Sequence, residues 1–72
     1  MSILATIFAY WVEIRHVDAD DWTHIHCPDW ETTESYGDAM AYAIRVRDDH
    51  PGARVQIVEA ADGLPDQHIV VA

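Results

Sequence analysis

Two histidines separated by one residue, His24 and His26, come closest of any residues in this sequence to a recognisable chemical site. In a β-strand, residues two apart lie on the same face, so both imidazoles would point to one side of a sheet. Glu13 could add a carboxylate from a neighbouring strand, and two imidazoles with one carboxylate can hold zinc or iron(II). The same residues also fit solvated strand histidines that pair with Glu13. A metal- or ligand-binding domain therefore stays an alternative, and we assign no metal and no cofactor.

The cysteine and serine residues, which are candidate nucleophiles, form no catalytic pattern. Cys27 is the only cysteine, which excludes an internal disulfide, and we expect it to be a small core residue rather than a reactive thiolate. The only serines are Ser2, near the N-terminus, and Ser35, at an expected helix cap, and there is no glycine-rich phosphate loop. We therefore predict that the protein is not an enzyme.

Charge is the strongest feature of the composition. Thirteen Asp and Glu residues are balanced by only four arginines and no lysine, which gives a formal net charge of −9. Because nucleic acids and anionic lipids are themselves negative, direct binding to either is not expected. The expected partner is a basic protein, including one whose basic groove normally holds nucleic acid. The alternative is that the charge only keeps a small protein soluble.

The sequence also predicts the cellular compartment of the protein and the number of its domains. A single cysteine fits a reducing compartment. The apolar run Ile3–Val12 is too short to cross a bilayer, and it has neither the basic flank nor the cleavage site of a signal peptide. We therefore expect a cytoplasmic protein. A chain of 72 residues buries about 62% of its unfolded surface on folding, which predicts a single domain over residues 1–72.

A β-hairpin is predicted to position the two histidines. Tyr10–Val17 alternates apolar and polar residues, and so does Trp22–Cys27. Pro28 ends the second strand because it cannot donate a ladder hydrogen bond. The polar residues Asp18–Asp21 between the strands are expected to form the turn.

A helix is predicted to follow, from about Ser35 to Asp49. Ser35 is a suitable cap with Asp38 three residues later, and His50-Pro51-Gly52 is a strong stop signal. Gly37 in the first turn is expected to mark a close approach to the sheet. The side predicted to face the core carries Tyr36, Ala39, Met40, Ala43, Ile44 and Val46. The side predicted to face solvent carries Asp38, Tyr42, Arg45 and Asp49.

Two more strands complete the predicted fold, Arg54–Glu59 and Gln67–Val71, separated by a turn that contains Asp62-Gly63. The element order is ββαββ. A right-handed crossover places the third strand beside the first. We therefore predict an α+β fold, with one helix packed on a four-stranded antiparallel sheet of order 2-1-3-4.

The expected hairpin turn fixes which residues share a face. The predicted pairs on one face are Val17 with Trp22, Arg15 with His24, Glu13 with His26, and Trp11 with Pro28. The predicted pairs on the other face are Ile14 with Ile25, and Val12 with Cys27. The second face is apolar, so we expect the helix to cover it and to leave the first face open.

Two tryptophans on an open sheet face have the composition of a binding hot spot. Trp11 and Trp22 therefore predict an interface, either with a second copy of the chain or with a different protein. The alternative is that the two indoles stack on each other and stay half exposed, which antiparallel sheets tolerate.

The stretch from Tyr10 to Arg47 resembles HicB-type antitoxins. A strand ends in Pro28-Asp29, a loop follows, and an alanine-rich helix begins after an acidic cap. The resemblance implies an acidic cap on a basic RNase-like toxin. Two features depart from the family: Glu31 stands where a glycine is usual, and the DNA-binding extension has no counterpart among these residues.

In size and composition the whole chain is similar to small acidic phage-encoded accessory proteins, including anti-CRISPR and other host-takeover inhibitors. Both resemblances imply stoichiometric binding that blocks a partner. We therefore interpret the protein as a non-enzymatic inhibitor or adaptor, with a structural homodimer as a further alternative. The predicted partner-binding residues are Trp11, Glu13, Arg15, Trp22, His24 and His26 on the open face, Asp18, Asp20 and Asp21 at the turn, and Asp38, Asp48 and Asp49 on the helix.

Overall fold

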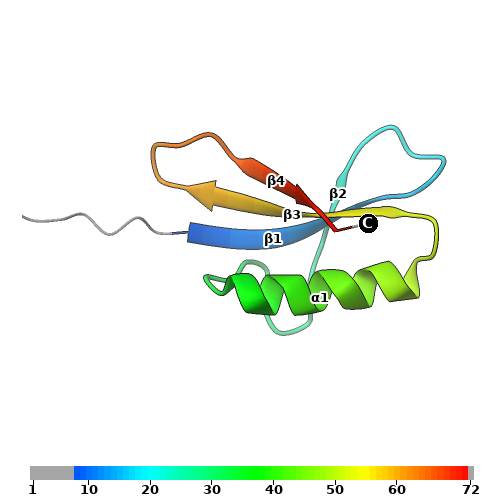
Figure 1. The fold of residues 1–72 in the computed structure, drawn as a ribbon, viewed down its shortest axis with the longest axis horizontal. Coiled ribbons are helices and arrows are strands. Elements are labelled where there is room, and N and C mark those ends of the chain that lie inside the picture. Colours follow the sequence, from blue (N-terminus) through cyan, green and yellow to red (C-terminus); the bar gives the residue numbers. More distant parts are fainter. Residues whose placement is uncertain (1–7, 72) are drawn as a thin grey trace, which may run out of the picture.

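The computed structural model describes residues 8–71, which form one helix on a four-stranded antiparallel sheet (Figure 1). The elements are β1 (Phe8–Arg15), β2 (Thr23–Ile25), α1 (Tyr36–Asp49), β3 (Arg54–Ala61) and β4 (Gln67–Val70). The strand order is β2-β1-β3-β4. The predicted α+β class, element order and strand order are therefore confirmed. Within residues 8–71, no helix is long and apolar enough to cross a membrane.

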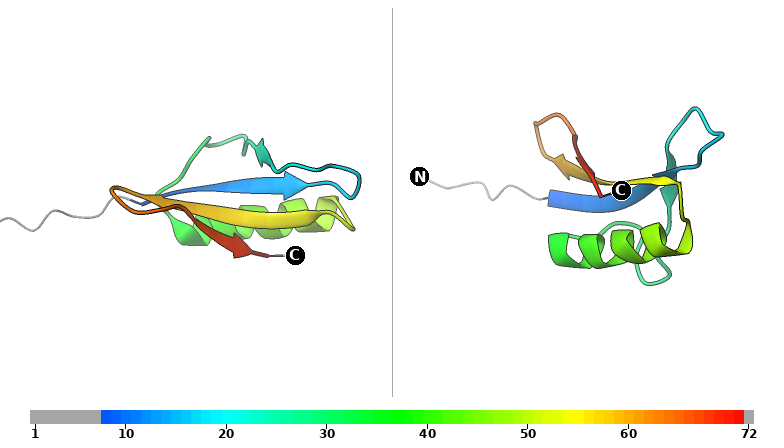
Figure 2. Two further views of the ribbon diagram at one scale, coloured as in Figure 1. Left: turned by 90° about the horizontal axis from the view of Figure 1, so that it is seen from above. Right: turned by 45° about the vertical axis from the view of Figure 1, so that its right-hand side comes forward.

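The two long strands, β1 and β3, form the centre of the sheet. They pair along their whole length, from Phe8 opposite Ala61 to Arg15 opposite Arg54. The views in Figure 2 show them side by side, with β4 along the outer edge of β3. In β1 the buried residues alternate along the strand, and Val55 and Ile57 of β3 face α1, as the sequence predicts. On the other side of β3, Gln56 and Val58 are also buried.

The core lies between this sheet and α1. Val12, Val55 and Ile57 are fully buried, and the helix contributes two small buried residues, Ala39 and Ala43. Small side chains let the helix backbone come close to the sheet, so a thin core can be tightly filled. The buried face of α1 differs from the prediction at three residues. Tyr36 and Ile44 are exposed, while Tyr42, predicted to face solvent, packs against the core beside Met40, which lies on its predicted side.

The first turn of α1 begins as the sequence indicates. Ser35 is the N-cap, and its Oγ accepts a hydrogen bond from the Asp38 backbone N–H at 3.2 Å. The expected close approach at Gly37 is wrong, because a Cβ placed there would meet nothing nearer than Ser35 Oγ at 3.8 Å. Gly52, after the helix, has φ +88°, a backbone conformation that glycine adopts without steric cost.

The predicted register of the first hairpin is wrong by two residues. The structure pairs Val12 with Ile25, Glu13 with His24, and Ile14 with Thr23. The connection is longer than expected, because β1 ends at Arg15 and β2 does not begin until Thr23. The Ala19 N–H donates to the His16 carbonyl at 2.9 Å, so a separate turn forms inside this connection. A slip of two residues keeps every side chain on its predicted face.

The second strand is also shorter than predicted. After Ile25 the chain leaves the sheet, and the Trp30 N–H donates to the Cys27 carbonyl at 3.3 Å in a turn. Cys27 therefore does not lie opposite Val12 in the core, and it is half-buried at the side of α1. The segment then returns to β1, where Thr33 and Tyr10 exchange backbone hydrogen bonds of 2.7 and 2.9 Å.

Candidate protein-interaction face

The face of the sheet turned away from α1 carries the aromatic residues predicted to bind a partner. We call this surface the indole face. It consists of Trp11, Glu13, Arg15, Trp22 and His24 from β1 and the β2 segment, together with Gln56 and Val58 from β3 and His68 from β4. The helix lies on the opposite side of the sheet, as Figure 1 shows. In the observed register Glu13 lies opposite His24, whereas the prediction placed it opposite His26. Arg15, predicted to lie opposite His24, has its guanidinium over the Trp22 ring.

A hydrogen-bonded network crosses the middle of the indole face through three strands. Trp11 Nε1 donates to Glu13 Oε2 at 3.2 Å, and Gln56 Nε2 donates to Glu13 Oε1 at 2.8 Å. Gln56 Nε2 also lies 3.0 Å from His68 Nδ1, which accepts when the imidazole hydrogen is on Nε2. Gln56 is only 3% exposed, so these bonds satisfy a buried amide and fix the orientation of the Trp11 indole.

Aromatic rings form a stacked column beside this network. The Trp11 and His24 rings have centroids 5.9 Å apart and planes 20° apart. The His24 and His26 rings are 4.6 Å and 15° apart. Trp22 is outside this column and makes a cation–π contact with Arg15, whose guanidinium carbon lies 5.5 Å from the Trp22 ring centroid. Each indole is therefore half-buried against its own neighbour.

The centre of the indole face is shielded by its own side chains. Val58, opposite Trp11 in the register, is 1% exposed although α1 is on the other side of the sheet. A partner would therefore contact the outer surfaces of the indoles and not the strand backbone beneath them.

The predicted acidic residues fall into two separate places. Asp18, Asp20 and Asp21 are exposed in the connection between β1 and β2, at one end of the indole face. The other three, Asp38, Asp48 and Asp49, lie on α1, in the opposite layer. The structure therefore brings the turn carboxylates near the indoles and does not bring the helix carboxylates there.

The histidines do not form a metal centre with Glu13. Within residues 8–71, no group of three or more His, Cys, Asp or Glu side chains is arranged to hold a metal ion. His24 Nε2 lies 3.2 Å from the Glu31 carbonyl oxygen, and Glu13 is occupied by Trp11 and Gln56. The metal alternative therefore finds no support in the geometry.

Sequence reasoning missed two members of the network, Gln56 and His68. The signal for Gln56 was available, because the alternation of Val55 and Ile57 puts it on the face opposite the core, and the predicted strand order sets β3 beside β1. His68 had the same kind of signal in β4. What the sequence did not indicate is that Gln56 is buried and bonded to Glu13.

Comparisons of the chain with protein-family models, with curated proteins and with solved structures find no match. The resemblances to HicB-type antitoxins and to phage inhibitors therefore stay predictions from the sequence. The function has to be argued from the geometry and charge of the indole face.

Proposed function

We propose that the protein is a non-enzymatic binding module that docks its indole face on a basic partner protein and blocks it. The observation that carries the proposal is a pair of ordered indoles, Trp11 and Trp22, on a sheet face that α1 leaves uncovered. Tryptophan and arginine are the side chains most enriched among residues that dominate binding energy.

The indoles are held in place before a partner arrives. Trp11 is fixed by its hydrogen bond to Glu13 and by stacking on His24. Trp22 is fixed by the guanidinium of Arg15. Ordering an interface side chain on binding costs about 0.5–1.5 kcal/mol, so prior ordering lowers the cost of docking.

Charge argues for a basic partner rather than a second copy. The chain has a net charge of −9, and the exposed carboxylates of Asp18, Asp20 and Asp21 lie at one end of the indole face. Two copies meeting face to face would bring like charges together, whereas a basic surface would be attracted. A protein surface that holds nucleic acid has this positive potential, so occupying it would exclude the nucleic acid.

Affinity capture tests the proposal. Tagged wild type, Trp22→Ala and a control, Ile44→Ala, are used to capture partners from the same lysate. Ile44 is an exposed apolar residue on α1, in the opposite layer. We expect a basic protein that is retained by wild type and Ile44→Ala and lost from Trp22→Ala, and that is released by high salt. Equal retention by both variants would overturn the proposal.

Oligomeric state is the second test. Light scattering is expected to give a mass near 8.2 kDa at neutral pH and high protein concentration. A dimer that Trp22→Ala dissociates would replace the basic partner with a second copy as the occupant of the indole face.

A further inference from the structure

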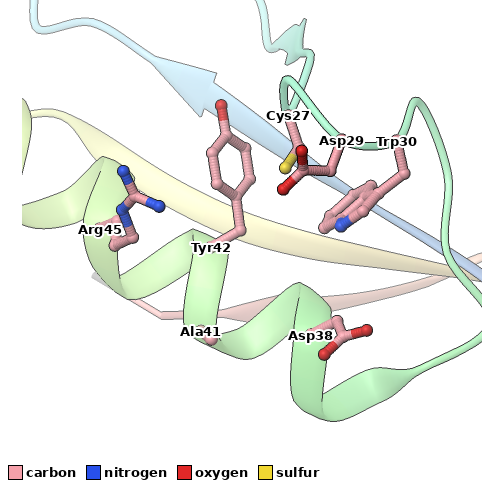
Figure 3. A pocket seen from close by; sticks show the side chains of 7 residues that line it. All are labelled: Cys27, Asp29, Trp30, Asp38, Ala41, Tyr42 and Arg45. Atoms are coloured by element: carbon pink, nitrogen blue, oxygen red, sulfur yellow. The ribbon is translucent and has the colours of Figure 1, made fainter.

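A pocket lies between α1 and the segment that follows β2, on the helix side of the sheet and away from the indole face (Figure 3). Its volume is about 320 Å³, at the lower end of the range of about 300–1,000 Å³ found for small-ligand sites. The residues that line it are Cys27, Asp29, Trp30, Asp38, Ala41, Tyr42 and Arg45.

One aromatic wall of the pocket is held by a side-chain hydrogen bond, and the other stands on a hydrogen-bonded turn. The Tyr42 hydroxyl donates to the His26 carbonyl at 2.9 Å, and the Trp30 backbone N–H donates to the Cys27 carbonyl at 3.3 Å. The two rings meet edge to face, with centroids 5.6 Å apart and planes 73° apart. Both side chains also pack against the hydrophobic core. The pocket therefore has a built wall and is not a gap between mobile side chains.

The charges in the pocket are separated along α1. In Figure 3 the Asp29 carboxylate lies beside Tyr42 and Trp30, and Asp38 lies on the same side of Tyr42 as Trp30. Arg45 lies beyond Tyr42 at the other end, seven residues after Asp38, which is about 10 Å along a helix axis. One end of the pocket is therefore aromatic and negative, while the positive group is at the far end.

Organic cations bind to aromatic ring faces that lie beside a carboxylate. The ring attracts the cation through its quadrupole, and the carboxylate accepts a charge-assisted hydrogen bond. Ala41 is the smallest side chain in the lining and precedes Tyr42 on α1. An inorganic cation would find fewer ligands here, since within residues 8–71 no three His, Cys, Asp or Glu side chains are arranged to hold a metal ion.

We propose that this pocket binds an organic cation, a guanidinium or a primary ammonium, on the aromatic surface that Trp30 and Tyr42 form together and against Asp29. Two kinds of ligand carry such a cation: a protein partner, through an arginine or lysine side chain, and a free amine such as putrescine. The site does not depend on the indole face, so it stands or fails separately from the proposed function.

The test is a titration of the whole chain followed by the NMR signals of the Trp30 indole N–H and the Tyr42 amide. N-acetyl-arginine amide is the probe, and N-acetyl-citrulline amide, which has the same shape without the charge, is its matched control. We expect the arginine probe to shift these signals saturably and the citrulline probe to bind at least about fivefold more weakly. Putrescine in place of the arginine probe distinguishes the sources, because tighter binding of one identifies the ligand type that the pocket prefers.

Variants separate the pocket from the general negative charge of the chain. Asp29→Asn is expected to weaken binding about fivefold, and Ala41→Leu to abolish it by filling the pocket. Arg45→Gln is expected to strengthen binding, because it removes the only cation in the lining. Asp62→Asn makes the same change of charge in the turn after β3 and should leave the affinity unchanged.

Two results would overturn the proposal: equal binding of the citrulline and arginine probes to wild type, or equal weakening by Asp62→Asn and Asp29→Asn. The first comparison uses only the wild-type chain, so it holds even if a pocket variant unfolds. Neither result depends on whether the indole face binds a partner.

Discussion

Gln56 shows how much a single buried side chain can determine on an otherwise open face. Its amide nitrogen donates to Glu13 at 2.8 Å and lies 3.0 Å from His68 Nδ1, while the residue is 3% exposed. An amide is the only neutral group of this size that can donate to both neighbours at once. The network therefore depends on the Gln56 amide nitrogen facing the Glu13 carboxyl oxygen.

Replacing that amide with a carboxylate tests the network with almost no change in shape. Gln56→Glu puts two carboxylates within hydrogen-bonding distance in a part-buried site, and we expect the free energy of unfolding to fall by about 2 kcal/mol at pH 7. The loss should shrink as pH falls and one carboxyl becomes protonated. Urea denaturation of wild type and variant at several pH values measures both effects.

The double variant Gln56→Glu with Glu13→Gln is the control, because it restores one donor and one carboxylate at the same two positions. It is expected to recover most of the lost stability. If Gln56→Glu alone is as stable as wild type, the network contributes nothing to the fold.

Two tyrosines make the stability of the fold sensitive to alkaline pH. Burial, followed by the nearby Glu59 carboxylate, raises the pKa of Tyr10 above its ordinary 10.0, and burial likewise raises the pKa of Tyr42. The unfolded chain therefore releases these protons at lower pH than the folded chain. Their stabilising contribution is complete below about pH 10 and is lost as pH rises through the folded pKa values.

We expect the denaturation midpoint to fall above about pH 10 and the fall to be smaller in Tyr10→Phe, which has no proton to lose. Absorbance of the tyrosinate in the folded chain reports the same titration directly. Tyr36 is exposed and meets the Tyr10 ring edge to face, so Tyr36→Phe removes an ionisable neighbour of Tyr10 and is expected to have the smaller effect. An equal effect of both substitutions would contradict the assignment to Tyr10.

At the level of residues, the sequence predicts which face a side chain occupies better than what that side chain contacts. Alternation places Trp11, Glu13 and His24 correctly because the period of a strand is two, and a slip of two residues leaves the faces unchanged. The partners of these residues depend on the length of the connection after Arg15. That connection contains no glycine or asparagine to fix a tight hairpin, so composition alone does not determine the register.

Among the elements, α1 is the best predicted and also shows the limit of local patterns. Ser35 and the stop at residues 50–52 locate its ends to within one residue. The helical period assigns Tyr42 to solvent, yet its hydroxyl donates to His26 and its ring meets Trp30. The segment after β2 covers this flank, and a contact between residues 16 positions apart in the chain leaves no signal in the helix sequence.

The glycine in the first turn of α1 is a weakness that the fold does not require. A Cβ at Gly37 would meet only Ser35 Oγ at 3.8 Å, and its φ is not positive. Gly37→Ala should therefore raise the free energy of unfolding by about 0.5 kcal/mol through a lower entropy of the unfolded chain. Thermal unfolding followed by circular dichroism measures it.

Gly52, just beyond the opposite end of α1, is the matched control. Its φ of +88° makes any side chain strained, so Gly52→Ala is expected to lose about 1 kcal/mol. The opposite signs of the two substitutions are the diagnostic result. A loss of stability in Gly37→Ala would show that the first turn is packed more closely than the structure describes.

For the whole molecule, the two layers carry different parts of the proposed activity. The sheet presents fixed indoles on one face, while much of the negative charge lies at the turns and on α1. Charges away from a contact act over distance and are screened by salt, whereas side chains within the contact act after docking. A partner should therefore respond differently to changes in the two places.

Kinetics with the captured partner separate these contributions. Replacing the turn carboxylates in Asp20→Asn/Asp21→Asn, or raising salt, is expected to lower the association rate several-fold with little change in dissociation, because steering is long-range. Trp22→Ala is expected to raise the dissociation rate at least about tenfold with little change in association. Surface plasmon resonance at two salt concentrations measures both rates. If the aspartate variant accelerates dissociation as much as Trp22→Ala does, the turn is part of the contact itself, and the docking surface extends beyond the indole face to the end of the hairpin.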